Sequence, residues 1–232
     1  LGNGWYNPLP LRMWGHVNLR ERLPVGRPQF LAQLRIEYAD GSRQVVASDS
    51  TWKVAAGPIL RNNIYLGEKV DARKAIQGWD EAGLDDRTWD AVRIAPAPAG
   101  RLQARPLPPV QVTASIQPLR ITEPADGVYI VDMGQNFGGW ARLTFDVAEG
   151  TQITMRYGEL LYEDGTLNPM TSVCGQIKRQ EPTPDGSPPV AWQTDTYIAR
   201  GNGPESYTPR FTFHAFRYIE ITGLPARPAL DD

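Results

Sequence analysis

Apolar and polar residues alternate along many short runs of this chain, and this period of two constrains the fold more than any other feature. In the run 30–38, for example, Leu34 and Ile36 alternate with Gln33 and Arg35. Such alternation is typical of a β-strand with one buried face. Asp40-Gly41 follows this run and precedes another, which predicts a β-hairpin.

Further strands are expected wherever the alternation recurs between turn residues. Helical periodicity is weak throughout, and only residues 80–89 are compatible with one short helical turn. The expected strands are 43–47, 51–54, 59–66, 110–122, 127–132, 139–147, 151–157, 194–200 and 208–222. Short strands separated by turns predict an all-β fold of two antiparallel, jelly-roll-like β-sandwich domains.

A Pro-rich stretch without alternation, residues 96–109, predicts a linker between the two domains. We expect residues 1–95 to form the first sandwich and residues 110–225 to form the second. Residues 226–232 are expected to lead to a domain outside this sequence. Because the chain opens on large apolar side chains rather than on a loose polar end, we expect the first sandwich to be N-terminally truncated.

Composition excludes several classes of protein. Twenty-four Lys and Arg residues against 26 Asp and Glu residues leave a net charge of −2, which does not favour nucleic-acid binding. No apolar run is long enough to span a membrane. The single cysteine, Cys174, excludes an internal disulfide framework and a Cys-rich zinc site. No signal peptide is evident, although a periplasmic or secreted location is favoured over a cytoplasmic one.

No catalytic residue can be assigned from a motif. The two histidines, His16 and His214, lack metal-binding spacing, and no nucleophile elbow, P-loop or dinucleotide fingerprint is present. His214 is expected to pack or hydrogen-bond in an aromatic strand. Glycosidases use pairs of carboxylates, but most acids here are expected to be solvated. The sequence pairs considered are Glu68 with Asp71, Asp85 with Asp86, and Glu159 with Asp164.

Two clusters of amide and aromatic residues are candidates for binding a sugar, because amides with a ring nearby suit sugar hydroxyls and apolar faces. A structural role is the alternative for each cluster. The candidates are Asn3, Trp5, Tyr6 and Asn7 in the first cluster, and Asn62, Asn63, Tyr65 and Glu68 in the second. The oxygens of Asn63, Glu68 and Asp71 would also suit Ca²⁺, which is the only cofactor we consider.

Other residues favour structural roles. Asp132 and Asn136 are expected to stabilise a strand–turn–strand through side-chain hydrogen bonds to the backbone. Four aromatic side chains near the C-terminus are expected to pack in the core or at a domain interface. These are Phe211, Phe213, Phe216 and Tyr218.

Long segments of the chain resemble bacterial α-L-rhamnosidases of glycoside hydrolase family 78. LGNGWYNP, LAQLRIEYADGS, RNNIYLGEKVDAR and GLDDRTW are similar to the N-terminal β-sandwich of that family. ITEPADGVYIVDMGQNFGGWARL, RYGELLYEDGTLN, TDTYIARG and PRFTFHAFRYIEITG are similar to its concanavalin-like sandwich. The segments occur in the family's order and cover nearly the whole chain.

The resemblance implies a parent enzyme that hydrolyses terminal α-L-rhamnose from glycosides with inversion. The family's catalytic residues lie on an (α/α)₆ barrel that is absent from this sequence, so the chain alone is expected to be inactive. It would be an accessory region that packs on the barrel and binds rhamnosyl sugar. An alternative is a stand-alone lectin-like module that binds rhamnose with Ca²⁺, as related sandwiches in some members do. An enzyme that uses its own carboxylate pair is the third reading.

Overall fold

The computed structural model describes residues 2–8, 12–13, 17–97, 100–173 and 190–231. His16 and Cys174 lie outside these residues. The chain divides into two compact units. Unit 1 contains Gln29–Ala56 and Ile76–Ser115, and unit 2 contains Gly2–Pro28, Gly57–Ala75 and Ile116–Asp232. None of the helices in the described residues has the length and apolar character needed to cross a membrane.

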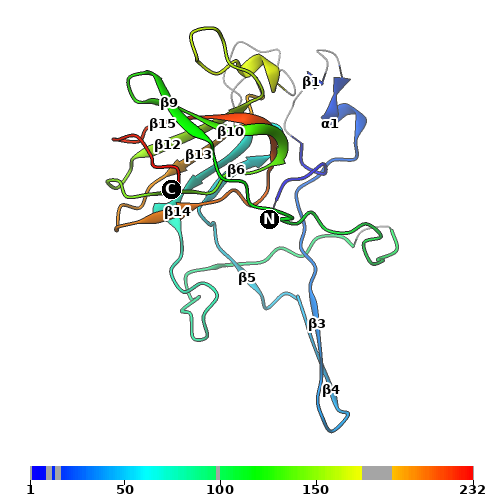
Figure 1. Cartoon of the computed structure of the whole chain (residues 1–232). Coiled ribbons are helices and arrows are strands. Elements are labelled where there is room, and N and C mark those ends of the chain that lie inside the picture. The colour runs from blue at the N-terminus through cyan, green and yellow to red at the C-terminus, as the bar shows by residue number, and fades with distance from the viewer. Residues whose placement is uncertain (1, 9–11, 14–16, 98–99, 174–189, 232) are drawn as a thin grey trace. The chain divides into compact units, whose positions relative to one another are not determined.

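Unit 1 contains the hairpin predicted around Asp40-Gly41. Strands β3 (Gln33–Glu37) and β4 (Arg43–Ala47) pair antiparallel, as Figure 1 shows. The Asp40 side chain accepts a hydrogen bond of 2.8 Å from the Ser42 N–H, and Gly41 adopts a φ of +82°. Glycine tolerates this left-handed conformation without steric cost, which explains why the turn forms here.

The other strands of unit 1 are short. β5 (Lys53–Val54) pairs with β8 (Asp90–Ala91), and residues 80–89 form turns rather than a helix. No described residue of this unit is buried. The buried interior expected of a sandwich is therefore found in unit 2, whereas unit 1 has two separate two-stranded sheets.

Unit 2 is built on a seven-stranded sheet with the strand order β6-β7-β13-β12-β15-β10-β9 (Figure 1). Strands β7 and β13 are parallel and the other neighbours are antiparallel, so the sheet is mixed. The strand bounds are β6 Ile59–Asn63, β7 Gly67–Asp71, β9 Arg120–Ala125, β10 Val128–Gly139, β12 Gln152–Gly158, β13 Thr194–Ile198 and β15 His214–Thr222.

Shorter elements complete unit 2. β11 (Leu143–Phe145) and β14 (Glu205–Tyr207) form a second, two-stranded sheet. The remaining elements are β1 (Arg12–Met13), β2 (Val17–Asn18), helix α1 (Leu19–Arg22) and the 3₁₀ turns η1 (Ala72–Lys74) and η2 (Pro169–Thr171).

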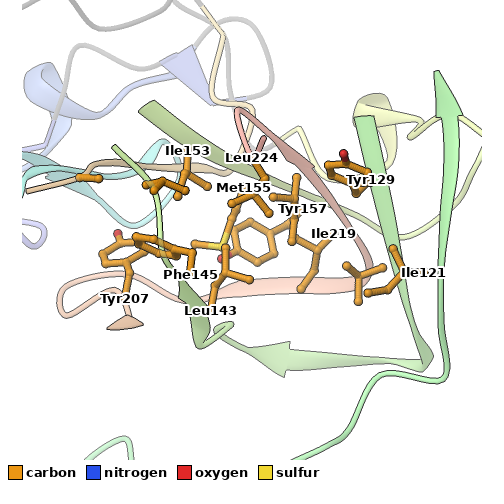
Figure 2. Close-up of a cluster of buried hydrophobic side chains, with 14 of the residues drawn as sticks. Ile121, Tyr129, Leu143, Phe145, Ile153, Met155, Tyr157, Tyr207, Ile219 and Leu224 are labelled. Atoms are coloured by element: carbon orange, nitrogen blue, oxygen red, sulfur yellow. The ribbon is translucent and has the colours of Figure 1, made fainter. Parts of the chain in front are cut away.

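The core of unit 2 joins its two sheets. In Figure 2, Leu143, Phe145 and Tyr207 from the smaller sheet lie beside side chains of the large sheet. Burying each large aliphatic or aromatic side chain stabilises the fold by about 1.5–3 kcal/mol. The predicted all-β class with sandwich packing is confirmed. The buried cluster consists of Val70, Ile121, Tyr129, Val131, Leu143, Phe145, Val147, Ile153, Met155, Tyr157, Ala199, Tyr207, Phe216, Ile219, Ile221 and Leu224.

Strand β10 replaces the expected strand–turn–strand with one long strand whose register shifts between Asp132 and Phe137. Asp132 accepts a 2.8 Å hydrogen bond from the Gly134 N–H, which confirms its predicted side-chain bond to the backbone. It also accepts two hydrogen bonds from the Arg217 guanidinium, at 2.9 and 3.2 Å. These bonds lower the pKa of the Asp132 carboxyl.

The four C-terminal aromatic residues divide between two faces. Phe216 and Tyr218 are buried, as a core role requires. Phe211 and Phe213 remain 40% and 42% exposed, because alternation along this segment turns them away from the core.

Candidate functional site

The turn between β6 and β7 positions the second predicted cluster. The Asn63 side-chain oxygen accepts hydrogen bonds from the N–H groups of Tyr65 and Leu66, at 2.8 and 3.1 Å. Gly67 then adopts a φ of +92° at the start of β7. An asparagine that satisfies the turn's backbone and a glycine in the left-handed region together close this hairpin.

The structure brings the two predicted clusters together, although 59 residues separate Asn3 from Asn62. The Asn3 N–H donates to the Asn62 side-chain oxygen, and the Asn3 amide donates to the Asn62 carbonyl, both at 2.8 Å. Trp5 packs edge-on against Tyr65 with ring centroids 5.6 Å apart. We call Asn3, Trp5, Asn7, Asn62 and Tyr65 the amide–aromatic cluster.

Within the amide–aromatic cluster, the amides form the support and an aromatic ring forms the surface. Asn7 donates a 2.8 Å hydrogen bond to the Asn3 side-chain oxygen, and Asn62 is buried. Trp5 is 53% exposed. The arrangement can therefore present an exposed, firmly held indole to an apolar ligand face.

Tyr6 does not join this cluster. A Cβ placed on Gly26 would lie 2.3 Å from the Tyr6 hydroxyl oxygen, so the ring lies directly against Gly26. The Gly26 N–H also donates to the Tyr6 carbonyl at 2.9 Å. The position of the Tyr6 ring is thus explained by local packing between the segments around these two residues.

Glu68 lies deeper than the sequence suggests, with only 1% of its surface exposed. Its carboxylate accepts hydrogen bonds of 3.3 Å from the Tyr207 hydroxyl and from the N–H groups of Arg210 and Phe211. Burial raises the pKa of Glu68, and the nearby Asp195 carboxylate adds to that rise. This carboxyl therefore favours folding most at pH below its unfolded pKa, and that contribution falls as pH rises through the folded pKa.

Asp195 on β13 is the centre of the buried contacts around Glu68. Its carboxylate accepts hydrogen bonds from the Glu68 N–H at 2.8 Å and from the Tyr157 hydroxyl at 2.9 Å. His214 Nε2 lies 3.1 Å from the same carboxylate. We call Glu68, Tyr157, Asp195, Tyr207 and His214 the buried polar cluster.

His214 has the hydrogen-bonding role predicted for it. Its Nδ1 lies 3.2 Å from the Gln193 side-chain oxygen, and its ring stacks on Tyr157 with centroids 4.1 Å apart. The Gln193 amide donates a 2.5 Å hydrogen bond to the Ser172 carbonyl, and this contact sets which end of that amide faces the histidine. The buried polar cluster therefore joins five strands of unit 2 (β7, β12, β13, β14 and β15) through hydrogen bonds, as a structural network requires.

The three residues predicted to bind calcium do not form a shared site. Asn63 accepts hydrogen bonds within its turn, and Glu68 is enclosed by Tyr207 and backbone N–H groups. Asp71 caps η1 and forms an ion pair with Arg73 at 2.8 Å, which lowers the pKa of Asp71. Across the described ranges, no group of three His, Cys, Asp or Glu residues is placed to hold a metal. These donors do not fit Ca²⁺, and the calcium prediction gains no support from them.

The other carboxylates considered lie in turns. Asp85 pairs with Arg87 at 2.6 Å, and Asp86 pairs with Lys53 at 2.8 Å. Asp164 accepts hydrogen bonds from the N–H and hydroxyl of Thr166. Asp85 and Asp164 are exposed and Asp86 is half-buried, and their contacts explain them as turn-stabilising groups.

Sequence reasoning missed Asp195 and Gln193. The signal for Asp195 was its position in the alternating run 194–198, on the same face as the apolar Tyr197 and Ala199. An acid on the apolar face of a strand indicates a buried carboxylate with dedicated donors. Gln193 has no comparable signal, because its φ of +48° and its contacts arise only in the folded chain.

Comparison with known families matches the chain in two consecutive parts. Residues 1–114 match the α-L-rhamnosidase N-terminal domain, and residues 122–232 match the bacterial α-L-rhamnosidase concanavalin-like domain.

Individual relatives agree with this. An α-L-rhamnosidase of Streptomyces avermitilis is 39% identical over 88% of this chain and 18% of its own length. The solved α-L-rhamnosidase of Dictyoglumus thermophilum is 40% identical, with a TM-score of 0.76, over 87% of this chain and 21% of that one. A Streptomyces avermitilis α-L-rhamnosidase solved with L-rhamnose is 38% identical, with a TM-score of 0.70, over 85% of this chain and 18% of that one. The chain thus spans about a fifth of the length of these relatives.

Proposed function

This chain belongs to the family of bacterial α-L-rhamnosidases, and we propose that it forms the non-catalytic accessory region of such an enzyme. One observation carries the proposal: two rhamnosidase domain families match successive parts of the chain, and together these parts leave most of each relative's length unmatched. The catalytic residues of the parent enzyme would lie in that remaining length. Its substrate would be a glycoside with terminal α-L-rhamnose, cleaved with inversion.

The accessory proposal includes a role in packing on the catalytic barrel of the parent chain. Several large apolar side chains of unit 2 are exposed, including Leu160 at 60% and Met170 at 59%. Exposed apolar side chains that form a contiguous patch are typical of sites that contact another domain. Such packing would shape the approach to the active site.

Activity measurements test whether this region is catalytic. We expect no release of p-nitrophenol from p-nitrophenyl α-L-rhamnoside by the 232-residue chain alone, because the catalytic residues of the parent enzyme would lie in the length of the relatives that this chain does not match. A parent protein containing the barrel is the positive control. Turnover by the isolated chain, retained through purification, would replace the accessory proposal with that of an independent enzyme.

We also propose that the amide–aromatic cluster binds the rhamnosyl sugar. Rhamnose is a 6-deoxy sugar whose methyl group and C–H bonds form apolar patches, and the exposed Trp5 indole can pack against them. The hydrogen bonds between Asn3 and Asn62 hold the segment that carries Trp5. A rigid support lowers the entropic cost of binding at this ring.

Calorimetry with L-rhamnose tests this binding. We expect heat of binding for the native chain and a loss of affinity of about tenfold for Trp5→Ala, since aromatic contacts contribute about 0.5–1.5 kcal/mol beyond burial. Trp79→Ala is the matched control, because Trp79 is 60% exposed but belongs to unit 1. Equal affinities for the two variants would place the sugar elsewhere.

The second candidate function is a stand-alone Ca²⁺-dependent lectin. The same titration distinguishes it from the accessory region. Heat that disappears with EDTA and returns with Ca²⁺ would favour the lectin. Because the oxygens of Asn63, Glu68 and Asp71 already have protein donors, we expect EDTA to leave the heat unchanged. No heat in either condition would remove sugar binding and leave the accessory role.

A further inference from the structure

The tripeptide Gly-Asn-Gly occurs twice in this chain, at residues 2–4 and 201–203. Asparagine followed by glycine is the most easily deamidated dipeptide, because no Cβ on the glycine hinders attack by its backbone nitrogen. The two sites have identical neighbours on both sides. Any difference between their reactivities in the folded protein therefore reports on structure rather than on local sequence.

The structure holds the two asparagines very differently. The Asn3 amide donates to the Asn62 carbonyl at 2.8 Å, and its side-chain oxygen accepts from Asn7 at 2.8 Å. Asn202 is exposed in the turn between β13 and β14. Neither the Asn202 side chain nor the Gly203 N–H forms a hydrogen bond with any residue that the structure describes.

The surroundings of Asn202 also leave room for the reaction. Gly203 adopts a φ of +99°, and a Cβ built on it would have no heavy atom within 4 Å. The turn itself is anchored beside this site, since the Glu205 carboxylate accepts hydrogen bonds from the N–H groups of Arg200 and Gly201 at 3.0 and 2.9 Å. The asparagine side chain is thus free to rotate on a held backbone.

We propose that Asn202 is a site of spontaneous deamidation in the folded protein and that Asn3 is protected from it. The Gly203 nitrogen, once deprotonated, attacks Cγ of Asn202 and forms a C–N bond. The side-chain nitrogen leaves as ammonia and a succinimide remains. Water opens the succinimide at either carbonyl and yields aspartate or isoaspartate, so no oxidant or reductant is required.

The products would alter this turn. Both carry a new carboxylate three residues from Glu205, whose own charge is already held by the turn's N–H groups. Isoaspartate also routes the main chain through Cβ of residue 202, which lengthens the turn by one atom between residue 202 and Gly203.

Peptide mapping of the aged protein tests the proposal. The folded 232-residue chain is held at mildly alkaline pH, sampled over days and digested with trypsin. The two sites fall in separate peptides, Leu1–Arg12 and Gly201–Arg210. We expect the mass gain from replacing NH₂ with OH to accumulate about tenfold faster in the second peptide, because the two hydrogen bonds at Asn3 must first break.

Two controls make the result decisive. In urea the two peptides should change at similar rates, because the folded contacts that distinguish them are absent. The Asn202→Gln variant should show no gain at residue 202, since the longer side chain forms the cyclic imide far less readily. Equal rates in the folded protein would overturn the proposal, and so would a tenfold difference that persists in urea.

Discussion

Replacing Gly67 with alanine is expected to detach the β6–β7 hairpin from the seven-stranded sheet. A Cβ at this position would lie 2.1 Å from the Thr194 carbonyl oxygen and 2.8 Å from the Asp195 carboxylate. The φ of +92° adds about 1–2 kcal/mol of backbone strain for alanine. We expect a total destabilisation above about 4 kcal/mol, seen as faster hydrogen exchange in β7 and β13.

Gly203→Ala is the matched control for this prediction. Its φ of +99° is close to that of Gly67, and it also lies in unit 2, but a Cβ there meets nothing within 4 Å. It should therefore show the backbone strain without the steric clash. If both variants lose the same stability, and β7 and β13 remain equally protected, β7 does not pair with β13 as described.

Asp195→Ala is expected to destabilise unit 2 by about 3–5 kcal/mol, because each buried polar group left without a hydrogen-bond partner costs about 1–3 kcal/mol. The change leaves the Glu68 N–H and the Tyr157 hydroxyl without their acceptor, and His214 Nε2 without its hydrogen-bond partner. Because the free energy of unfolding of a domain is commonly only about 5–15 kcal/mol, the variant would lose much of its stability. Denaturant titration followed by circular dichroism measures the change.

An exposed aspartate in the same unit provides the control. Asp146→Ala should change stability by no more than about 0.5 kcal/mol, because its side chain lies at the surface. A similarly small effect at Asp195 would mean that the buried polar cluster contributes little to the stability of unit 2. Asp195→Asn should fall between the two, since its amide keeps one acceptor oxygen but places N–H donors opposite others.

Much of the fold was predictable from local patterns. The Asp40-Gly41 hairpin formed as expected, because its turn chemistry and the alternation on both sides act within a few residues. The strand at 67–71 was missed, since Glu68, Lys69 and Asp71 do not alternate with apolar residues. Its place depends on parallel pairing with β13, more than a hundred residues away, which no local pattern records.

In the candidate site too, local sequence patterns do not record contacts between distant segments. The amide and aromatic residue types around Asn3 and Asn62 were recognisable, but their joining into one cluster rests on contacts between distant segments. Residue types also suggested that Asn63, Glu68 and Asp71 bind a metal. In the folded chain, their side-chain oxygens accept hydrogen bonds from backbone N–H groups. Asn63 shows why: one oxygen suits a cation or a turn equally well, and only the backbone conformation decides between them.

The pairing of β7 with β13 has a consequence for the order of events during synthesis. Glu68 emerges from the ribosome 127 residues before Asp195, its buried partner. At about 5–20 residues per second, the β6–β7 hairpin waits roughly 6–25 s with an unpaired strand edge. The β6–β7 hairpin is polar, with Arg61, Asn62 and Lys69 along its strands. Charged strands resist edge-to-edge association with other chains, which protects the hairpin during this interval. These polar side chains would thus limit association of the nascent chain until β13 has been synthesised.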